Sequence, residues 1–158
     1  MDIILHPIGW VHSAENGPRE DYWGDVVSEI HLASHFSPDT LVGLEEFSHI
    51  EVLFHLHGVD ESAIVQGSRH PRGNPQWPRC GIFAQRAKAR PNRIAATICE
   101  LLSVEGLTLQ IRGLDALNGS PVLDIKPVFA EFLPHQTSLR QPEWSHQMMA
   151  NYFASGKP

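Results

Sequence analysis

The chain has 158 residues, of which 42% are apolar and 19% charged; these ordinary values exclude an intrinsically disordered protein. The length predicts one domain over residues 1–158, and the formal net charge of −6 argues against a general polyanion-binding protein. No basic flank precedes a long apolar stretch, and no apolar run approaches the roughly 20 residues of a membrane span. We therefore expect a cytoplasmic protein without a membrane partner.

The first half of the chain is typical of short strands joined by polar loops. Residues 3–11 predict a strand at a sheet edge or bulge, and residues 26–32 alternate weakly and predict a second. Residues 50–57 are rich in β-branched and aromatic side chains and predict a third. A long Pro- and Gly-rich loop is expected over 58–78, followed by a short buried strand over 81–84.

The second half continues the same pattern. Residues 94–104 fit either a helix or a strand, whereas the alternation over 107–112 favours a hairpin and 118–121 forms a turn into another strand. We expect a mainly β fold: a small antiparallel β-barrel or curved sheet with short helices. Its core should span residues 1–135, with a C-terminal helix over 141–154.

Side chains that ligate metals are frequent but lack a metal-binding pattern. His55 and His57 alternate within a predicted strand, so both imidazoles share a face and are able to bind one ion. No further ligand stands at a suitable spacing, so no metal site is predicted and histidines packed at a sheet edge are favoured. Cys80 and Cys99 show no motif spacing, which fits half-buried thiols in a reducing cytoplasm.

Positive charge is concentrated in one segment of this acidic chain. No Asp or Glu lies between Ser62 and Cys99, whereas seven of the twelve Lys and Arg residues do: Arg69, Arg72, Arg79, Arg86, Lys88, Arg90 and Arg93. Such a segment suits a phosphate, a carboxylate or a nucleic acid; arginines that pair with acids elsewhere in the fold explain it equally well. Pro91 fixes the backbone beside Arg90 and Asn92, a rigidity that suits paired hydrogen bonds to an anion.

A second segment combines a tight turn with polar residues at the end of a strand. Residues 118–121 read Asn-Gly-Ser-Pro, and residues 124–127 read Asp-Ile-Lys-Pro. These residues indicate either ligand contacts or a plain hairpin with a salt bridge. The sequence contains no glycine-rich dinucleotide loop, no P-loop and no nucleophile elbow, so a Rossmann-type fold is not expected.

Taken in order, these stretches resemble the TrmO family over most of residues 5–128. The matching stretches are Pro7-Ile8-Gly9, Pro18-Arg19, Gly43 to His49 running on to His57, Gly81 to Arg86 with Arg90-Pro91-Asn92, and Asn118 to Pro127. The resemblance implies a small non-Rossmann β-barrel that works as a homodimer. It also implies S-adenosylmethionine as cofactor and methylation of the exocyclic amino nitrogen of threonylcarbamoyladenosine beside the tRNA anticodon.

The resemblance also assigns residues, in three groups. The cofactor-binding group is Pro18, Arg19, His57, Gly58, Arg86, Asp124, Ile125, Lys126 and Pro127. The substrate-binding group, nearer to the tRNA anticodon loop, is Arg69, Arg72, Lys88, Arg90, Asn92 and Arg93. The catalytic candidates are Asp124, Arg90 and His57, among which the sequence does not choose.

Two other interpretations remain open. The first is an S-adenosylmethionine-binding module, a sensor or partner protein, without methyl transfer to tRNA. The second is a metal-dependent enzyme built on the histidines. Neither DNA nor a membrane is an expected partner.

Overall fold

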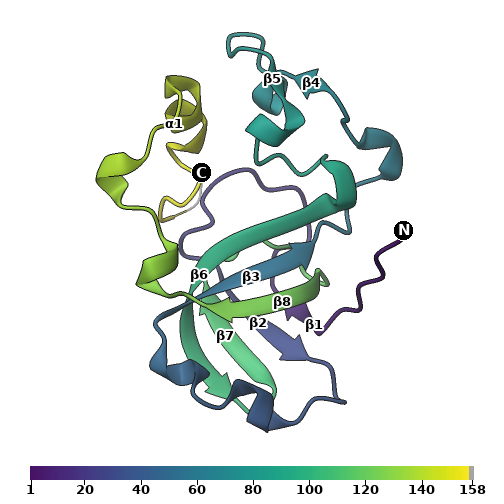
Figure 1. Cartoon of the computed structure of the whole chain (residues 1–158), viewed down its shortest axis with the longest axis vertical. Coiled ribbons are helices and arrows are strands. Elements are labelled where there is room, and N and C mark those ends of the chain that lie inside the picture. The colour runs from purple at the N-terminus through teal and green to yellow at the C-terminus, as the bar shows by residue number, and fades with distance from the viewer. Residues whose placement is uncertain (157–158) are drawn as a thin grey trace.

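The structure is a computed structural model that describes residues 1–156. Six antiparallel strands close into a barrel in the order β1-β2-β7-β6-β3-β8 (Figure 1). Their bounds are β1 Gly9–His12, β2 Val27–Leu32, β3 His49–His55, β6 Ile94–Glu105, β7 Thr108–Arg112 and β8 Pro121–Pro127. The mainly β, antiparallel barrel expected from the sequence is therefore confirmed, and the ambiguous residues 94–104 lie in its longest strand.

Short elements surround the barrel. Above one end of it stands the two-stranded sheet of β4 (Ser68–Arg69) and β5 (Cys80–Gly81), and beside this sheet lies the helix α1 (Glu143–Met149) (Figure 1). The 3-10 turns are η1 Pro38–Leu41, η2 Leu44–Glu46, η3 Glu61–Ala63, η4 Pro71–Gly73, η5 Ile82–Ala84, η6 Pro91–Arg93, η7 Ala130–Phe132 and η8 Gln136–Ser138. Within residues 1–156, no helix combines the length and the apolar character needed to cross a bilayer.

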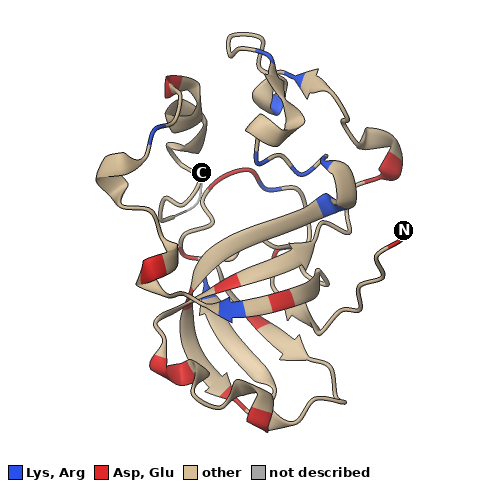
Figure 2. Ribbon diagram, in the orientation of Figure 1, with Lys and Arg blue, Asp and Glu red and all other residues tan. Residues whose placement is uncertain are grey.

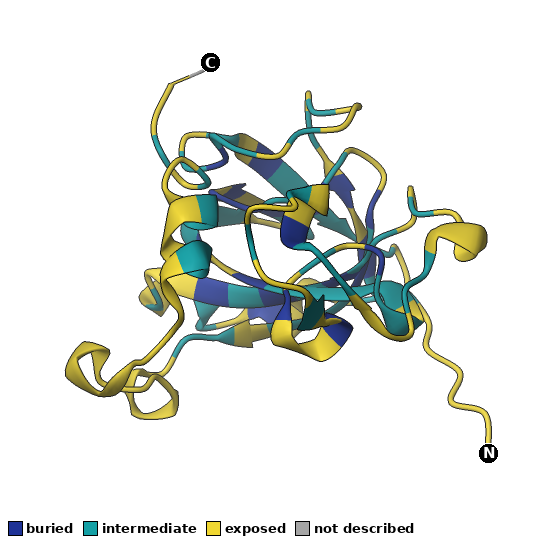
Figure 3. Cartoon of the chain, turned by 90° about the horizontal axis from the view of Figure 1, so that it is seen from above, coloured by how far each residue is buried: buried dark blue, intermediate teal, exposed yellow. Residues whose placement is uncertain are grey.

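Alternation along the strands separates the barrel interior from its outer wall. In β3 the side chains of Ile50, Val52 and Phe54 are buried, whereas those between them face outward. Figure 3 shows the buried residues gathered inside the barrel. Burying each such side chain contributes about 1.5–3 kcal/mol, so this interior is the main source of stability.

The first strand is shorter than the sequence indicated. β1 begins only at Gly9, and Ile3, Ile4 and Leu5 are exposed in an N-terminal arm (Figure 3). A Cβ built on Gly9 would lie 2.5 Å from the His31 carbonyl oxygen, so the close pairing of β1 with β2 requires glycine there. The strand expected over 3–11 is therefore wrong for its first six residues.

The stretch 81–84 is also not the buried strand that was predicted. β5 ends at Gly81, and residues 82–84 form the 3-10 turn η5. Ile82 is buried in this turn, whereas Phe83 is 78% exposed. A 3-10 helix has three residues per turn, so neighbouring side chains point in different directions. Two consecutive apolar residues in the sequence do not show which of them is buried.

The C-terminal part leaves the barrel and returns to it. Residues 129–142 are exposed and lead from β8 to α1, which covers Glu143–Met149, a shorter span than the expected 141–154. Pro142 stands at the N-cap, and beyond the helix the chain turns back toward the loop at residues 21–25. The barrel strands themselves lie between Gly9 and Pro127, inside the expected core of residues 1–135.

Candidate functional site

Several of the proposed cofactor-binding residues lie on the outer wall formed by β6, β3 and β8. The register places Ala96, Leu53 and Asp124 in one row across the three strands, and Ile98, Glu51 and Lys126 in the next. Asp124 and Lys126 therefore face outward, whereas Ile125 is paired with the inward-facing Val52. The run 124–127 is thus divided between the two faces of the wall.

Arg86 reaches the same wall from the loop after η5. Its Nη2 atom donates a hydrogen bond of 2.6 Å to the Ala96 carbonyl oxygen. Asp124 lies two strands away from Ala96, a lateral distance of about 10 Å at the usual strand spacing. Because Arg93 and Leu101 of β6 bond to β3, the Ala96 carbonyl points away from β3, so the Arg86 guanidinium lies at the opposite edge of β6 from Leu53 and Asp124.

The Asp124 carboxylate is held by its own strand. One oxygen accepts a hydrogen bond of 2.9 Å from the Ile125 amide, and the other accepts a hydrogen bond from the Lys126 ammonium. The Asp124 side chain raises the pKa of Lys126, first through the hydrogen bond and then through its charge. The Lys126 ammonium therefore stays charged near neutral pH.

His57 lies in the turn after β3, beside the turn at residues 118–121. The Ser120 hydroxyl and His57 Nδ1 are 3.3 Å apart, and Ser120 is buried. A Cβ built on Gly119, whose φ is +80°, would lie 3.9 Å from His57 Nε2, and Gly58, next to His57 in the sequence, is exposed. His57 Nε2 makes no hydrogen bond with any residue of 1–156, so this nitrogen is available to a ligand.

Arg19 holds its own loop together. Its guanidinium forms an ion pair of 2.7 Å with Glu15, donates to the carbonyl oxygens of Asp21 and Tyr22, and lies 5.2 Å from the ring centroid of Trp23. Pro18, beside it, is exposed. Arg19 thus shapes this loop, and Pro18 is the more accessible of the two.

Many of the basic residues gather at the same end of the molecule as β4 and β5, whereas the acidic residues are spread over the barrel and both of its ends (Figure 2). Some of them are already paired: Arg72 lies 2.8 Å from an Asp21 oxygen, and Arg93 lies 3.4 Å from Glu61. Arg90 donates to the Gln85 carbonyl oxygen at 2.9 Å. The predicted tRNA-binding residues are therefore not equivalent, since Arg72 and Arg93 also join loops.

Three of the predicted substrate residues are less constrained. Lys88 is exposed and forms no ion pair within residues 1–156, and Asn92 is exposed with φ of +63°. Arg69 is half-buried, and its Nε atom has no hydrogen-bond partner in the same residues. Lys88 is thus the cation of this group most open to a phosphate.

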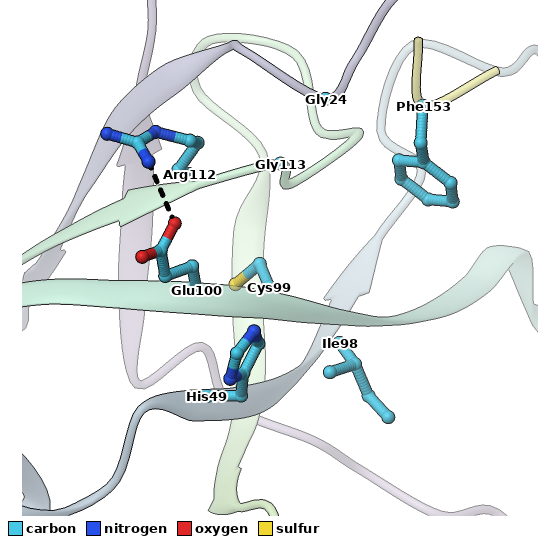
Figure 4. Close-up of a pocket in the computed structure, with 8 residues that line it drawn as sticks. All are labelled: Gly24, His49, Ile98, Cys99, Glu100, Arg112, Gly113 and Phe153. Carbon is cyan, nitrogen blue, oxygen red and sulfur yellow. Dashed lines mark hydrogen bonds and ion pairs between the residues drawn. The ribbon is translucent and has the colours of Figure 1, made fainter. Parts of the chain in front are cut away.

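A shallow hollow of about 250 Å³ lies further along the same outer wall (Figure 4). Ile98 and Phe153 line it with apolar atoms, and Arg112 and Glu100 form an ion pair of 2.9 Å at its edge. The alternation within β6 places Ile98 and Glu100 on one face. No local pattern indicates that Phe153, more than 50 residues later in the sequence, joins them.

A part-buried cluster of polar side chains against β6 is marked by no local sequence pattern. The Asp115 carboxylate accepts hydrogen bonds of 2.5 Å from the Thr97 hydroxyl and from the Tyr152 hydroxyl. Within residues 1–156, no three His, Cys, Asp or Glu side chains are placed to share a metal ion. Elsewhere on the barrel, His31 contacts Glu29 at 2.6 Å and stacks on His12.

Comparison with known proteins identifies the family. Residues 11–132 match the tRNA-methyltransferase O N-terminal domain. This chain belongs to the TrmO family. TrmO crystal structures superpose on it, one with a TM-score of 0.72 and 30% identity over 89% of this chain and 64% of the other. A TrmO structure from Pseudomonas aeruginosa gives a TM-score of 0.67 with 29% identity, over 90% of this chain and 64% of the other.

Relatives of this TrmO chain differ in length. A probable S-adenosyl-L-methionine-binding protein of Methanothermobacter thermautotrophicus is 39% identical over 83% of this chain and 93% of the relative. The human tRNA (adenine(37)-N6)-methyltransferase is 34% identical over 83% of this chain and 31% of the relative. The Escherichia coli protein of that name is 40% identical over 67% of this chain and 48% of the relative. This chain thus spans less than half of either methyltransferase.

Proposed function

We propose that this chain is an S-adenosylmethionine-dependent methyltransferase that acts on the exocyclic amino nitrogen of threonylcarbamoyladenosine beside the tRNA anticodon. The observation that carries the proposal is the match of residues 11–132 to the tRNA-methyltransferase O N-terminal domain. The Asp124–Lys126 pair beside Leu53 on the outer wall, with Arg86 at the edge of β6, adds a chemical reason. The basic residues at one end of the molecule add an electrostatic reason, since they suit the negatively charged tRNA.

The groups on the wall fit the methyl donor. S-adenosylmethionine carries a carboxylate, an ammonium, a sulfonium and an apolar adenine ring. Arg86 suits the carboxylate, Asp124 suits a cationic group or a ribose hydroxyl, and Leu53 offers apolar contact. When bound, this donor supplies an electrophilic methyl group, so the protein mainly aligns it with the acceptor nitrogen.

The acceptor nitrogen bears a carbamoyl group, which withdraws its lone pair, so loss of its proton assists attack. Among the three catalytic candidates, Asp124 already accepts two hydrogen bonds and Arg90 remains cationic. Nε2 of His57 is the basic atom among the three candidates that has no hydrogen-bond partner within residues 1–156. We therefore assign to His57 the removal of the proton from the acceptor nitrogen. Arg90 then stabilises the negative charge that develops on the carbamoyl group.

We also propose a cytoplasmic homodimer as the working form. Its support is the resemblance to the TrmO family together with exposed apolar side chains at Ile3, Ile4, Phe129 and Phe132, of which Ile3 is 82% and Phe132 84% exposed. Neither a membrane nor DNA is a proposed partner.

A methyl-transfer assay tests the proposal. Purified chain is incubated with methyl-labelled S-adenosylmethionine and total tRNA, taken from cells with and without the threonylcarbamoyl modification. The labelled nucleoside is then identified by mass. We expect label on methylated threonylcarbamoyladenosine, and none where the modification is missing. Asp124→Asn should lower the rate at least about tenfold, because it removes a charge beside the donor.

Glu100→Gln is the matched control, since this carboxylate lies on the same wall but is paired with Arg112. Glu100→Gln should leave the methyl-transfer rate within twofold of that of the unaltered chain. Donor binding measured by calorimetry, with no label in any tRNA, would reject methyl transfer and support the binding-module interpretation. Equal losses in both variants would instead place the donor elsewhere on the protein.

A further inference from the structure

The C-terminal segment closes back on the barrel beside the loop that carries Pro18 and Arg19. The amides of Tyr22 and Trp23 donate to the carbonyl oxygens of Asn151 and Tyr152, at 2.9 and 2.8 Å. A Cβ built on Gly24 would lie 2.1 Å from the Phe153 carbonyl oxygen, so the two backbones touch only because residue 24 is glycine. The segment is thus fitted against this loop.

Tyr152 anchors the segment to the barrel. Its hydroxyl donates to one Asp115 oxygen at 2.5 Å, while the Thr97 hydroxyl donates to the other at 2.5 Å. Thr97 is buried in β6, so the anchor belongs to the barrel wall. Both carboxylate oxygens therefore have donors, and hydrogen bonds to a charged acceptor are about twice as strong as neutral ones.

The same segment also reaches the basic end of the molecule. The Trp77 indole nitrogen donates to the Gln147 side-chain oxygen at 3.1 Å. Arg72, in the same loop as Trp77, pairs with Asp21 in the loop at residues 18–25. The C-terminal segment, the loop at 18–25 and the loop at 69–79 therefore form one connected unit, fixed to the barrel at Asp115.

We propose that Tyr152 is a positioning residue, which holds the loop at residues 18–25 in the form that binds S-adenosylmethionine. The inference rests on the proposed function, since it takes Pro18 and Arg19 as part of the cofactor site. Tyr152 acts through the loop: its carbonyl oxygen and that of Asn151 hold the amides of the residues that follow Asp21. Its hydroxyl fixes this arrangement to Asp115.

The environment of Tyr152 keeps its proton in place. Burial raises the pKa of Tyr152, and the Asp115 carboxylate raises it further, so the phenol remains a donor through neutral and mildly alkaline pH. The anchor is therefore present throughout the range in which the enzyme would work.

Tyr152→Phe removes only the anchoring hydroxyl, and Thr108→Val is its matched control. Thr108 begins β7, outside the proposed cofactor and tRNA sites, and its hydroxyl makes no hydrogen bond within residues 1–156. Two quantities are measured on the full chain: the Kd for S-adenosylmethionine by calorimetry, and amide hydrogen exchange at residues 22 and 23. Steady-state kinetics with modified tRNA then separate KM for the donor from kcat.

In Tyr152→Phe we expect the protection of both amides to fall about tenfold, the loss that follows from removing a hydrogen bond to a charged group. Kd and KM for S-adenosylmethionine should rise severalfold, with kcat within twofold. Asp115→Asn should give the same change, and the double variant no more than either alone. Thr108→Val should behave like the unaltered chain.

Unchanged affinity in Tyr152→Phe would overturn the proposal, even if the amides exchange faster, because the anchor would then be purely structural. A fall in kcat with unchanged KM would overturn it as well. If the chain binds S-adenosylmethionine but transfers no methyl group, the transferase proposal is rejected. The role of Tyr152 is still tested, because the Kd for S-adenosylmethionine is measured without turnover. Absence of donor binding in the unaltered chain overturns both.

Discussion

The two cysteines of the chain differ because of where each lies in the fold. Cys99 is buried inside the barrel on β6, and burial raises the pKa of its thiol to about 12, with a further contribution from the Asp115 carboxylate. Cys80 lies half-buried in β5, near the basic end. Since the thiolate is the reactive form, the two thiols should differ widely in reactivity.

We expect a disulfide reagent at pH 8 to modify one thiol per folded chain quickly, and mass mapping to place it on Cys80. Cys99 should react only after unfolding, because its thiol stays protonated below about pH 12. In Cys80→Ser the fast phase should disappear. Fast labelling of Cys99 in a chain that remains folded would show that the barrel interior opens.

At the scale of elements, one buried amide links the two short strands of the basic lobe, residues 64–93. Gln85 is 6% exposed, and its Nε2 atom donates to the carbonyl oxygens of Arg69 and Cys80, at 3.0 and 2.9 Å. These two acceptors belong to β4 and β5. A two-stranded sheet of this size is marginal alone, so the amide is part of what fixes the lobe.

Replacing Gln85 with Met keeps the volume but leaves both carbonyl oxygens without their donor. The free energy of unfolding should fall by about 2–3 kcal/mol, which urea denaturation measures. Gln110→Met, an exposed position on β7, should change it by less than about 0.5 kcal/mol. Equal stability of the two variants would show that water replaces the Gln85 donor.

The local sequence pattern predicts most of the barrel strands. It fails where contacts with distant residues determine the bounds or the type of an element. The alternation over 50–57 and 107–112 matches β3 and β7, because the period of two directly reflects one buried face. The late start of β1 is not visible in the local pattern, and the strand begins at Gly9, where the backbone of β2 approaches too closely for a side chain. Residues 94–104 fit two periods, and only pairing with β3 and β7 settles them as a strand.

The residues of the candidate site also fall into those that a sequence motif indicates and those that only the fold brings together. The resemblance selected Asp124 and Lys126, which the structure places on one outward face. It also grouped Arg72 with the substrate residues, although its partner Asp21 is 51 residues away in the sequence. Tyr152 and Asp115 carry no motif, so only the folded chain brings them together.

For the molecule as a whole, the separation of charge offsets the net charge of −6. The basic loops stand together at one end of the barrel, whereas the acids are spread over the molecule, so a polyanion is drawn to the basic end (Figure 2). Lys88 and Arg79 are exposed there. Such contacts release counterions, and affinity then depends on salt concentration.

Lys88→Gln should weaken tRNA binding uniformly and lower the slope of log K against log salt by about 0.7–0.9. Adding Arg79→Gln should lower it by a similar amount again. Arg112→Gln, whose cation is paired with Glu100 on the barrel wall, should leave the slope unchanged. Filter binding at several salt concentrations measures these values, and equal slopes in all variants would place the RNA elsewhere.

The strand order of the closed barrel also governs how the chain is able to fold. β2 ends at Leu32 but pairs with β7, which begins at Thr108, and β1 closes the ring only against β8. Such pairing between distant segments requires large loops to close, and the entropy cost of closing them precedes the stabilising contacts. Proteins with this kind of topology typically fold in milliseconds to seconds. During synthesis, the hairpin of β1 and β2 must therefore wait, with an open edge, until residues beyond 121 have left the ribosome.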